Sequence, residues 1–213
     1  MLNSRVIDIL KTFSTGELKR FGEFLSSPYH NKNKKAILLF EFLSKYHPSY
    51  DNKNLTKEKL FAGIFSNGSK DYNDASIRNL FSDLTVLSEK FLSFMRFEKD
   101  RFDFSERFLR ELSERKLTGI FEKKIKSLEE LALNNEFDGE EYFYKKFVIE
   151  ELKSSSRQFG DNLKLYKDNS GIRTSEYLSY FYLIKIFKLV NFFEFQKQYN
   201  IYNEKNFAVR LLE

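Results

Sequence analysis

"NDASIRNLFSDLTVLSEKFLSFMRF", residues 73–97, is the stretch with the clearest helix signal in the chain. Its apolar residues recur every three or four positions, which is the spacing of one face of an α-helix. They are Ile77, Leu80, Phe81, Leu84, Leu87, Phe91, Leu92 and Met95. Asn73 and Asp74 precede this pattern and are good N-cap residues. The pattern predicts a helix about 35 Å long at ~1.5 Å per residue, which we expect to lead from an N-terminal group of about five helices into further helices.

Upstream, the same spacing predicts a helix that ends at a sharp corner. Residues 14–17, Ser-Thr-Gly-Glu, have the form of a capping box, in which serine and glutamate each satisfy a free backbone N–H of the other. An apolar face follows over residues 18–25. Pro28 is expected to end this helix because the residue before a proline disfavours the α region. Residues 26–31 are therefore interpreted as a corner, after which the next helix begins near Asn33.

The remaining helices are predicted from similar patterns of apolar spacing, caps and turns. The charged residues 98–101 mark a soft boundary, so we expect an N-terminal helical module over residues 1–100 and a helical-hairpin region over residues 101–213. The other helices are expected over residues 33–46, 56–65, 105–116, 120–131 and 140–152, with a short one around 159–166 and a long one that Thr174 or Ser175 caps.

Composition agrees with an all-α chain. The 213 residues include only 2 prolines and 8 glycines, and no run of Val, Ile and Thr alternates as in a strand. Hydrophobic residues make up 41%, which is enough for a core, and aromatic residues make up 17%. The tetratricopeptide pattern requires Trp, which is absent. We predict an N-terminal helical bundle followed by irregular, solenoid-like antiparallel helical hairpins.

The most aromatic segment, residues 177–195, predicts a surface for protein contact. Lys185 and Lys188 interrupt it, so we expect no membrane span and interpret it as a helix buried on most sides. Either an earlier helix pair encloses it, or the chain is truncated at Glu213 and its aromatic face is exposed for self-association. The expected interaction surface consists of Tyr177, Phe181, Phe187, Phe192 and Phe195.

No motif predicts catalysis, a metal site or a cofactor. The two histidines, His30 and His47, lack the spacing of zinc ligands and are interpreted as turn residues. Neither of the glycine-rich phosphate-binding motifs occurs, and the paired glutamates lack the histidine partners of a di-iron site. The serines at 154–156 have no general base beside them in the sequence. We therefore expect no enzyme, no catalytic residue, no metal and no cofactor.

A basic cluster suggests an alternative function, nucleic-acid binding. Residues 18–59 contain nine Lys or Arg and four Asp or Glu, which accounts for the whole formal net charge of +5. Lys19, Arg20, Lys32, Lys34 and Lys35 flank the corner and could contact an anion or a phosphate backbone. The other interpretation is a solvated surface. Residues 56–84 could also form a helix-turn-helix, although the connection is longer than usual.

Two groups of residues in the first hundred form a further pattern. The first group is Phe13, Ser14, Glu17, Leu18, Lys19, Phe21, Phe24, Leu25, Ser27, Pro28, Tyr29, Asn31 and Asn33. The second is Leu55, Thr56, Lys57, Glu58, Phe61, Phe65, Tyr72, Asn73, Asp74, Arg78, Asn79, Leu80, Ser82, Asp83, Leu84, Phe91 and Leu92. Together they resemble an uncharacterised family of bacterial all-helical proteins with the N-terminal signature F-S-x-x-E-L-K…F-L-x-S-P-Y-x-N. The resemblance implies a helical N-terminal module joined to further helices, in chains often longer than this one, and it carries over no catalytic residue.

The sequence therefore predicts a non-catalytic helical protein-protein interaction module. Its partner is expected to be another protein or a copy of itself that docks on aromatic-rich grooves between helices. The alternative is a nucleic-acid-binding regulatory protein with a helix-turn-helix. The chain contains no cysteine and no apolar N-terminal leader, so a cytoplasmic location is expected.

Overall fold

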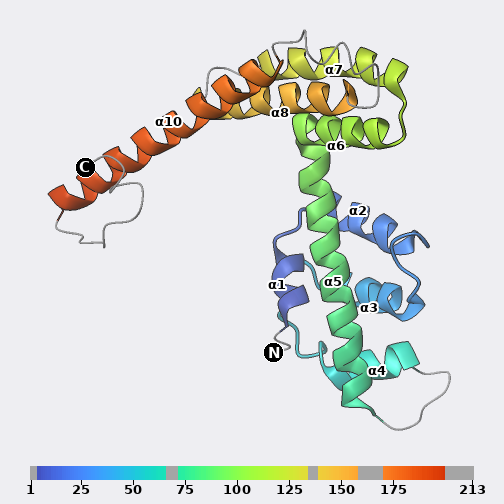
Figure 1. Cartoon of the computed structure of the whole chain (residues 1–213). Coiled ribbons are helices and arrows are strands. Elements are labelled where there is room, and N and C mark those ends of the chain that lie inside the picture. The colour runs from blue at the N-terminus through green and yellow to red at the C-terminus, as the bar shows by residue number, and fades with distance from the viewer. Residues whose placement is uncertain (1–3, 66–71, 134–138, 158–169, 200–213) are drawn as a thin grey trace. The chain divides into compact units, whose positions relative to one another are not determined.

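The computed structural model describes residues 4–65, 72–133, 139–157 and 170–199, and within them every regular element is a helix. This confirms the predicted all-α class. The chain divides into two compact units, Met1–Lys99 and Asp100–Glu213, which are described separately. The described helices of the first unit (Figure 1) are α1 (Arg5–Lys11), α2 (Thr15–Ser26), α3 (Lys34–Ser44), α4 (Lys57–Phe65) and α5 (Asp74–Lys99). Those of the second are α6 (Arg101–Glu114), α7 (Thr118–Leu133), α8 (Gly139–Arg157) and α10 (Ser170–Gln198).

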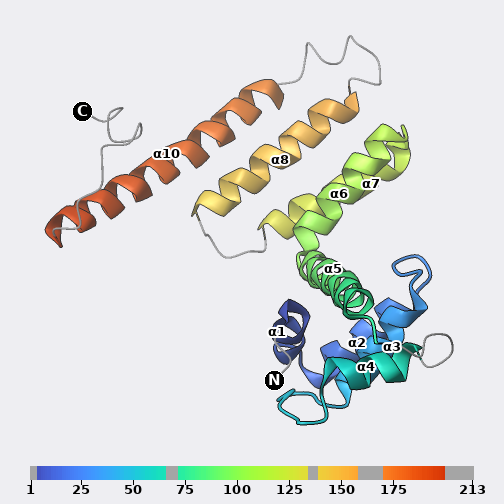
Figure 2. The ribbon, with the colours of Figure 1, turned by 90° about the horizontal axis from the view of Figure 1, so that it is seen from below.

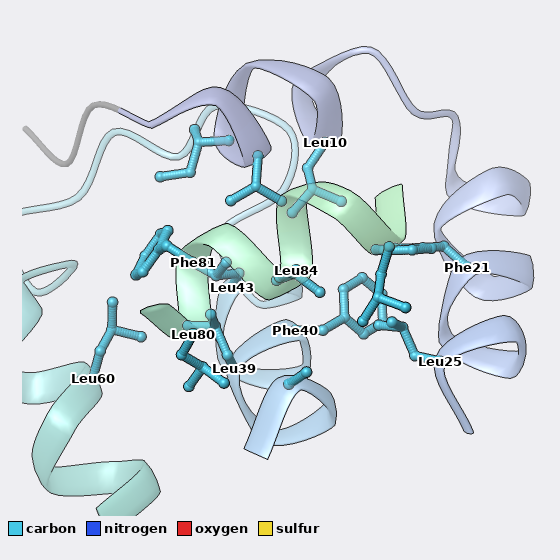
Figure 3. Close-up of a cluster of buried hydrophobic side chains, with 14 of the residues drawn as sticks. Leu10, Phe21, Leu25, Leu39, Phe40, Leu43, Leu60, Leu80, Phe81 and Leu84 are labelled. Atoms are coloured by element: carbon cyan, nitrogen blue, oxygen red, sulfur yellow. The ribbon is translucent and has the colours of Figure 1, made fainter. Parts of the chain in front are cut away.

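The long helix α5 forms the centre of the first unit, where α1, α2, α3 and α4 all pack against it. In Figure 1, α1 lies to one side of α5 and the other three helices lie to the opposite side. The core joins side chains of all five helices (Figure 3), among them Leu10, Phe21, Leu25, Leu39, Phe40, Leu43, Leu60, Leu80, Phe81 and Leu84. All the apolar residues predicted to share one face of α5 are buried except Leu92, which is 39% exposed.

The N-terminus of α2 is a capping box, as predicted. The Ser14 backbone N–H donates to Oε2 of Glu17 over 2.8 Å, and the Glu17 N–H donates to Oγ of Ser14 over 3.2 Å. The first of these bonds lowers the pKa of Glu17, since it stabilises the ionised carboxylate. The capping box therefore satisfies two backbone N–H groups at the start of α2.

The corner between α2 and α3 is built on two asparagines. The buried Asn31 donates from Nδ2 to the carbonyl oxygens of Leu25 (3.0 Å) and Asn33 (3.1 Å), and its Oδ1 accepts from the Asn33 N–H (2.8 Å). Asn33 caps α3 by accepting the Lys35 N–H, and its Nδ2 donates to Asp83 on α5. The predicted corner is confirmed, and Asn31 satisfies backbone groups that would otherwise be buried without partners.

The second unit is a row of helices in which each contacts the next. Helix α6 packs on α7 and α8, α7 packs on α8, and α8 packs on α10. Figure 2 shows α8 and α10 side by side. Among the residues that the structure describes, the buried core of this unit comes from its first three helices: Phe102, Leu109, Leu112, Phe121, Ile125, Leu128, Ala132, Val148, Ile149 and Leu152. Helix α10 therefore contributes nothing to the fully buried core.

Three predicted boundaries differ from the structure by more than two residues, and one of these differences has a side-chain cause. Helix α6 begins at Arg101 rather than near residue 105, because Oδ1 of Asp100 accepts from the N–H groups of both Phe102 and Asp103. Helix α10 begins at Ser170, and the Ser175 hydroxyl donates to the Ile172 carbonyl instead of capping. Helix α8 runs on to Arg157, so the three serines before it are helical. The predicted helix at 159–166 lies outside the described residues.

One expectation for the most aromatic segment is wrong. Among residues 171–199 no side chain is buried, so α10 is not a helix enclosed on most sides. Among the described helices its main neighbour is α8, and most residues of 171–199 remain exposed. No helix in the described part of the chain is long and apolar enough to cross a membrane.

The corner predicts a stability effect. Changing Asn31→Ala removes three hydrogen bonds and leaves buried backbone groups unpaired, so we expect the free energy of unfolding to fall by about 1–3 kcal/mol. Urea unfolding followed by far-ultraviolet circular dichroism measures this. The neighbouring Tyr29→Ala is the control, because Tyr29 is 89% exposed and its loss should change stability by less than about 0.5 kcal/mol. Equal unfolding midpoints for the two variants would contradict the role given to Asn31.

The packing of α5 predicts a second contrast. Leu84→Ala empties a fully buried position and should lower the free energy of unfolding by about 2–5 kcal/mol. Leu92→Ala removes the same atoms from the exposed edge of the helix, so we expect about 1 kcal/mol or less. The same urea titrations test both variants. A larger loss for Leu92→Ala would show that the orientation of α5 is wrong.

Candidate functional site

The contact between α8 and α10 is an antiparallel pair of helices rich in aromatic rings. Phe143 of α8 lies with its ring centroid 6.5 Å from Tyr177 and 5.1 Å from Tyr180, and Tyr144 lies 5.5 Å from Phe181. These centroid distances fit the offset and tilted geometries that aromatic pairs prefer. The pair thus buries part of one face of α10 against the beginning of α8.

Two glutamates of α8 hold α10 in register. Near the end of α8, the buried Glu150 pairs with Lys153 on its own helix (2.9 Å) and with Arg173 on α10 (3.5 Å). At its start, Glu140 pairs with both Lys185 (2.9 Å) and Lys188 (3.3 Å). Residues late in α8 contact residues early in α10, and residues early in α8 contact residues late in α10. The two helices are therefore antiparallel.

Glu140 and Glu150 are referred to as the anchors of α10. Glu140 is the more exposed of the two, and its pKa is shifted. The hydrogen bond from Lys185, together with the nearby cation of Lys188, keeps the pKa of this carboxyl below its ordinary value. Glu140 also lies in the first turn of α8, where the helix dipole favours a negative charge. The ionised carboxylate therefore stabilises both the N-terminus of α8 and the contact with α10.

Helix α10 extends beyond the start of α8. Gly139, the first residue of α8, lies within van der Waals reach of Ile184, whereas α10 continues to Gln198. Figure 2 shows this end of α10 running past the end of α8. We refer to residues 189–199 as the overhang.

The face of α10 that packs on α8 continues along the overhang. Phe192, Phe195 and Tyr199 follow Phe181 and Lys188 at three- and four-residue spacing, so they lie on the same side of the helix. Their side chains are 52%, 53% and 63% exposed. We call these three residues the overhang stripe; the rings of Phe195 and Tyr199 pack together with centroids 4.5 Å apart.

The expected interaction surface on α10 is split by the contact with α8. Tyr177 and Phe181 are half-buried against α8, whereas Phe187, Phe192 and Phe195 are exposed. Phe187, at 67% exposure, points away from the overhang stripe at ~100° of rotation per residue. Phe192 and Phe195 are therefore the two expected residues that belong to the unpaired continuation of the α8 face.

The basic cluster of the first unit is partly engaged within the fold. Arg20 forms an ion pair with Glu98 of α5, and Nζ of Lys35 lies 4.0 Å from the centroid of the Phe65 ring. Lys19, Lys32 and Lys34 are exposed. Arg78, which lies in the second helix of the expected helix-turn-helix, pairs with Asp74 one turn away. The connection between α4 and α5 lies partly outside the described residues.

Both histidines pack against the first unit. The His30 ring stacks on Phe24 with centroids 4.2 Å apart, and its edge contacts Phe94 at 5.2 Å. Nε2 of His47 lies 2.8 Å from the carbonyl oxygen of Phe13. Within the described ranges no group of three or more His, Cys, Asp or Glu side chains is placed to hold a metal ion.

A groove that sequence analysis did not identify lies between α7 and α8 in the second unit. It has a volume of about 580 Å³ and is open to solvent, with Phe121, Lys126 and Glu129 among the residues that line it. Lys153 projects into it and pairs with Glu129 and Glu150. Burial lowers the pKa of Lys153, but these two carboxylates raise it further, so the lysine is held as a cation and has the features of a structural ion pair rather than a nucleophile.

Comparison with known proteins does not indicate a function, so the function has to be inferred from the contacts described above. No protein-family model, no curated protein and no solved structure matches the sequence.

The Glu140 anchor predicts a pH dependence. Because its pKa is lowered in the folded state, its contribution to stability is fully present above the ordinary pKa of 4.5 and is lost as pH falls through the folded-state pKa. We expect Glu140→Gln to lower the urea midpoint at pH 7 and to have a smaller effect at pH 3. Glu194→Gln is the control, since Glu194 pairs with Lys197 inside α10 and joins no helices. An equal effect of Glu140→Gln at both pH values would contradict the anchor.

Proposed function

We propose that this chain is a non-catalytic helical protein-protein interaction module that binds through the exposed aromatic side of α10. The single observation that carries the proposal is the overhang stripe, because it continues a face that is built for helix contact. Along α8 this face is covered by Phe143 and Tyr144, and along Phe192, Phe195 and Tyr199 no described residue covers it from another helix. Large exposed apolar patches on monomers commonly mark binding sites.

The energetics support a binding role for these rings. A phenylalanine or tyrosine side chain presents about 150–250 Å², and roughly half of each ring in the stripe is exposed. Covering that area at ~25 cal/mol per Å² is worth on the order of 2 kcal/mol per ring. Three rings on one side of a helix match the way an amphipathic helix is recognised in a groove.

Nucleic-acid binding is supported by fewer observations. Arg20 and Lys35 are engaged with Glu98 and Phe65, which leaves three lysines of the expected cluster exposed. Proteins that bind duplex DNA strongly make about 6–10 phosphate contacts. The absence of cysteine supports a cytoplasmic location as part of the proposal.

The proposal is tested by comparing two variants of the full chain for binding to the same partner. Proteins retained by the immobilised chain are identified, and the recovered partner is purified and titrated against each variant. We expect the double variant Phe192→Ser, Phe195→Ser to weaken its Kd at least about tenfold, since the two rings contribute more than 1.4 kcal/mol. The triple variant Lys32→Glu, Lys34→Glu, Lys35→Glu is the control and should bind as the parent does.

The opposite pattern would overturn this assignment. If the lysine variant loses binding and the aromatic variant keeps it, the surface lies on the first unit. If the parent chain is retained on a phosphate matrix in a salt-dependent way and the lysine variant is not, nucleic-acid binding becomes the better explanation.

A further inference from the structure

We propose that the groove between α7 and α8 binds an acidic peptide segment of another protein, in which carboxylates alternate with apolar side chains. The residues that line this groove belong to α7 and α8 and not to the exposed side of α10. It is therefore a second binding surface, beyond the one in the proposed function. The class of occupant is inferred from the length of the groove, its charges and its apolar side chains.

The groove extends past the contact between α7 and α8. A second hollow of about 520 Å³ lies at the start of α7, with Leu117 and Ile120 among the residues that line it. The two hollows share Gly119 and Lys123, so they adjoin and form one groove, which we call the α7 groove. From Leu117 to Glu129 it follows α7 for about 18 Å at ~1.5 Å per residue. That length matches about five residues of an extended peptide.

The charges of the α7 groove favour an acidic occupant. Three exposed lysines of α7 line it: Lys123, Lys124 and Lys126. Among the residues that the structure describes, these lysines take part in no ion pair. Of the two glutamates that line the groove, Glu129 is already paired with Lys153, which leaves Glu122 against three cations. Carboxylates entering the groove would therefore meet lysines without breaking an existing ion pair, and a basic segment would be repelled.

Apolar side chains line the same groove. Leu117 and Ile120 are 42% and 48% exposed at the start of α7, and the buried Phe121 and Ile125 line the part beside α8. Ligand sites commonly combine apolar walls with a few polar groups that fix orientation. Apolar side chains of the occupant would cover Leu117 and Ile120 while its carboxylates contact the lysines.

These features favour a peptide over a nucleic acid or a membrane surface. Proteins that bind duplex DNA strongly make about 6–10 phosphate contacts, at least twice what three lysines supply. Glu122 and Glu129 would also lie against a continuous phosphate backbone. A flat anionic bilayer would contact the rims of the groove and leave its hollows unfilled. A short acidic peptide fits both the length and the sign of the charge.

Gly119 allows the groove to be closed without a clash inside the fold. It lies where the two hollows meet, and a Cβ added there would meet nothing within 4 Å outside its own stretch of helix. Gly16 is a matched position in the first unit, because it also follows a threonine at the start of a helix and also has open space around it. A phenylalanine at position 119 is therefore expected to fill the groove, and the same change at position 16 leaves the groove open.

Fluorescence polarisation of the full chain tests the proposal with a defined probe. The probe is a fluorescein-labelled peptide of alternating glutamate and leucine, about ten residues long. We expect it to bind the parent, and we expect the variant Lys123→Glu, Lys124→Glu, Lys126→Glu to raise its Kd at least about tenfold. The control with the same change in net charge is a variant of three exposed lysines in the first unit, which should keep the parent's Kd: Lys19→Glu, Lys32→Glu, Lys34→Glu.

The glycine variants test the position of the peptide independently of charge. Gly119→Phe is expected to raise the Kd of the same probe several-fold, whereas Gly16→Phe should leave it unchanged. A second probe, in which serine replaces each leucine, should bind the parent several-fold more weakly. Far-ultraviolet circular dichroism checks that every variant retains its helices.

Each other outcome contradicts a specific part of the proposal. A parent that does not bind the glutamate–leucine probe overturns it, and so does equal loss of binding in the two lysine variants. Unchanged binding by Gly119→Phe overturns the placement, and equal affinity for the serine probe overturns the apolar contribution. If anionic phospholipid vesicles or a single-stranded oligonucleotide bind the parent through Lys123, Lys124 and Lys126 and the peptide does not, the class of occupant is wrong. The partner titration with Phe192→Ser, Phe195→Ser leaves α7 unchanged, so the proposed function stands or fails separately.

Discussion

The register between α8 and α10 is the constraint on which the candidate surface depends. Glu150 and Glu140 each pair with basic residues of α10, and these two contacts act at opposite ends of the helix pair. A slip of one turn would move Glu150 away from Arg173 and would change which residues of α10 face Glu140 and Phe143. With the register held, α10 must extend past Gly139, so the exposed rings follow from where the charges are placed.

The two long helices of the chain, α5 and α10, differ in how far their apolar side chains are buried. Helix α5 has one apolar side and four helices to cover it, and Ile77 and Leu84 on that side are fully buried. Helix α10 is apolar nearly all round and packs on α8, so no described residue of it reaches full burial. The candidate surface is therefore exposed because α10 has more apolar side chains than its neighbouring helix can cover.

Much of the fold could be predicted from periodicity and caps, because these signals are local. The capping box at Ser14, the corner before Asn33 and the inward side of α5 all depend on residues close in sequence. Helix α1 was not predicted, and the start of α6 depended on which of several charged residues became the cap. The candidate surface was harder. In a helix apolar on all sides, nothing local shows which side meets a neighbour, so Tyr177 and Phe181 could not be distinguished from Phe192 and Phe195.

The length of α10 also affects how its exposed end is held. An isolated helix shorter than about 12–15 residues is marginal in water, because forming its first turn is unfavourable. The overhang alone is below that length, but it continues a segment that α8 already holds in the helical state. That segment supplies the nucleus, and each further residue only has to propagate the helix. Association can then begin from rings that already project from one side, so little chain ordering remains to oppose it.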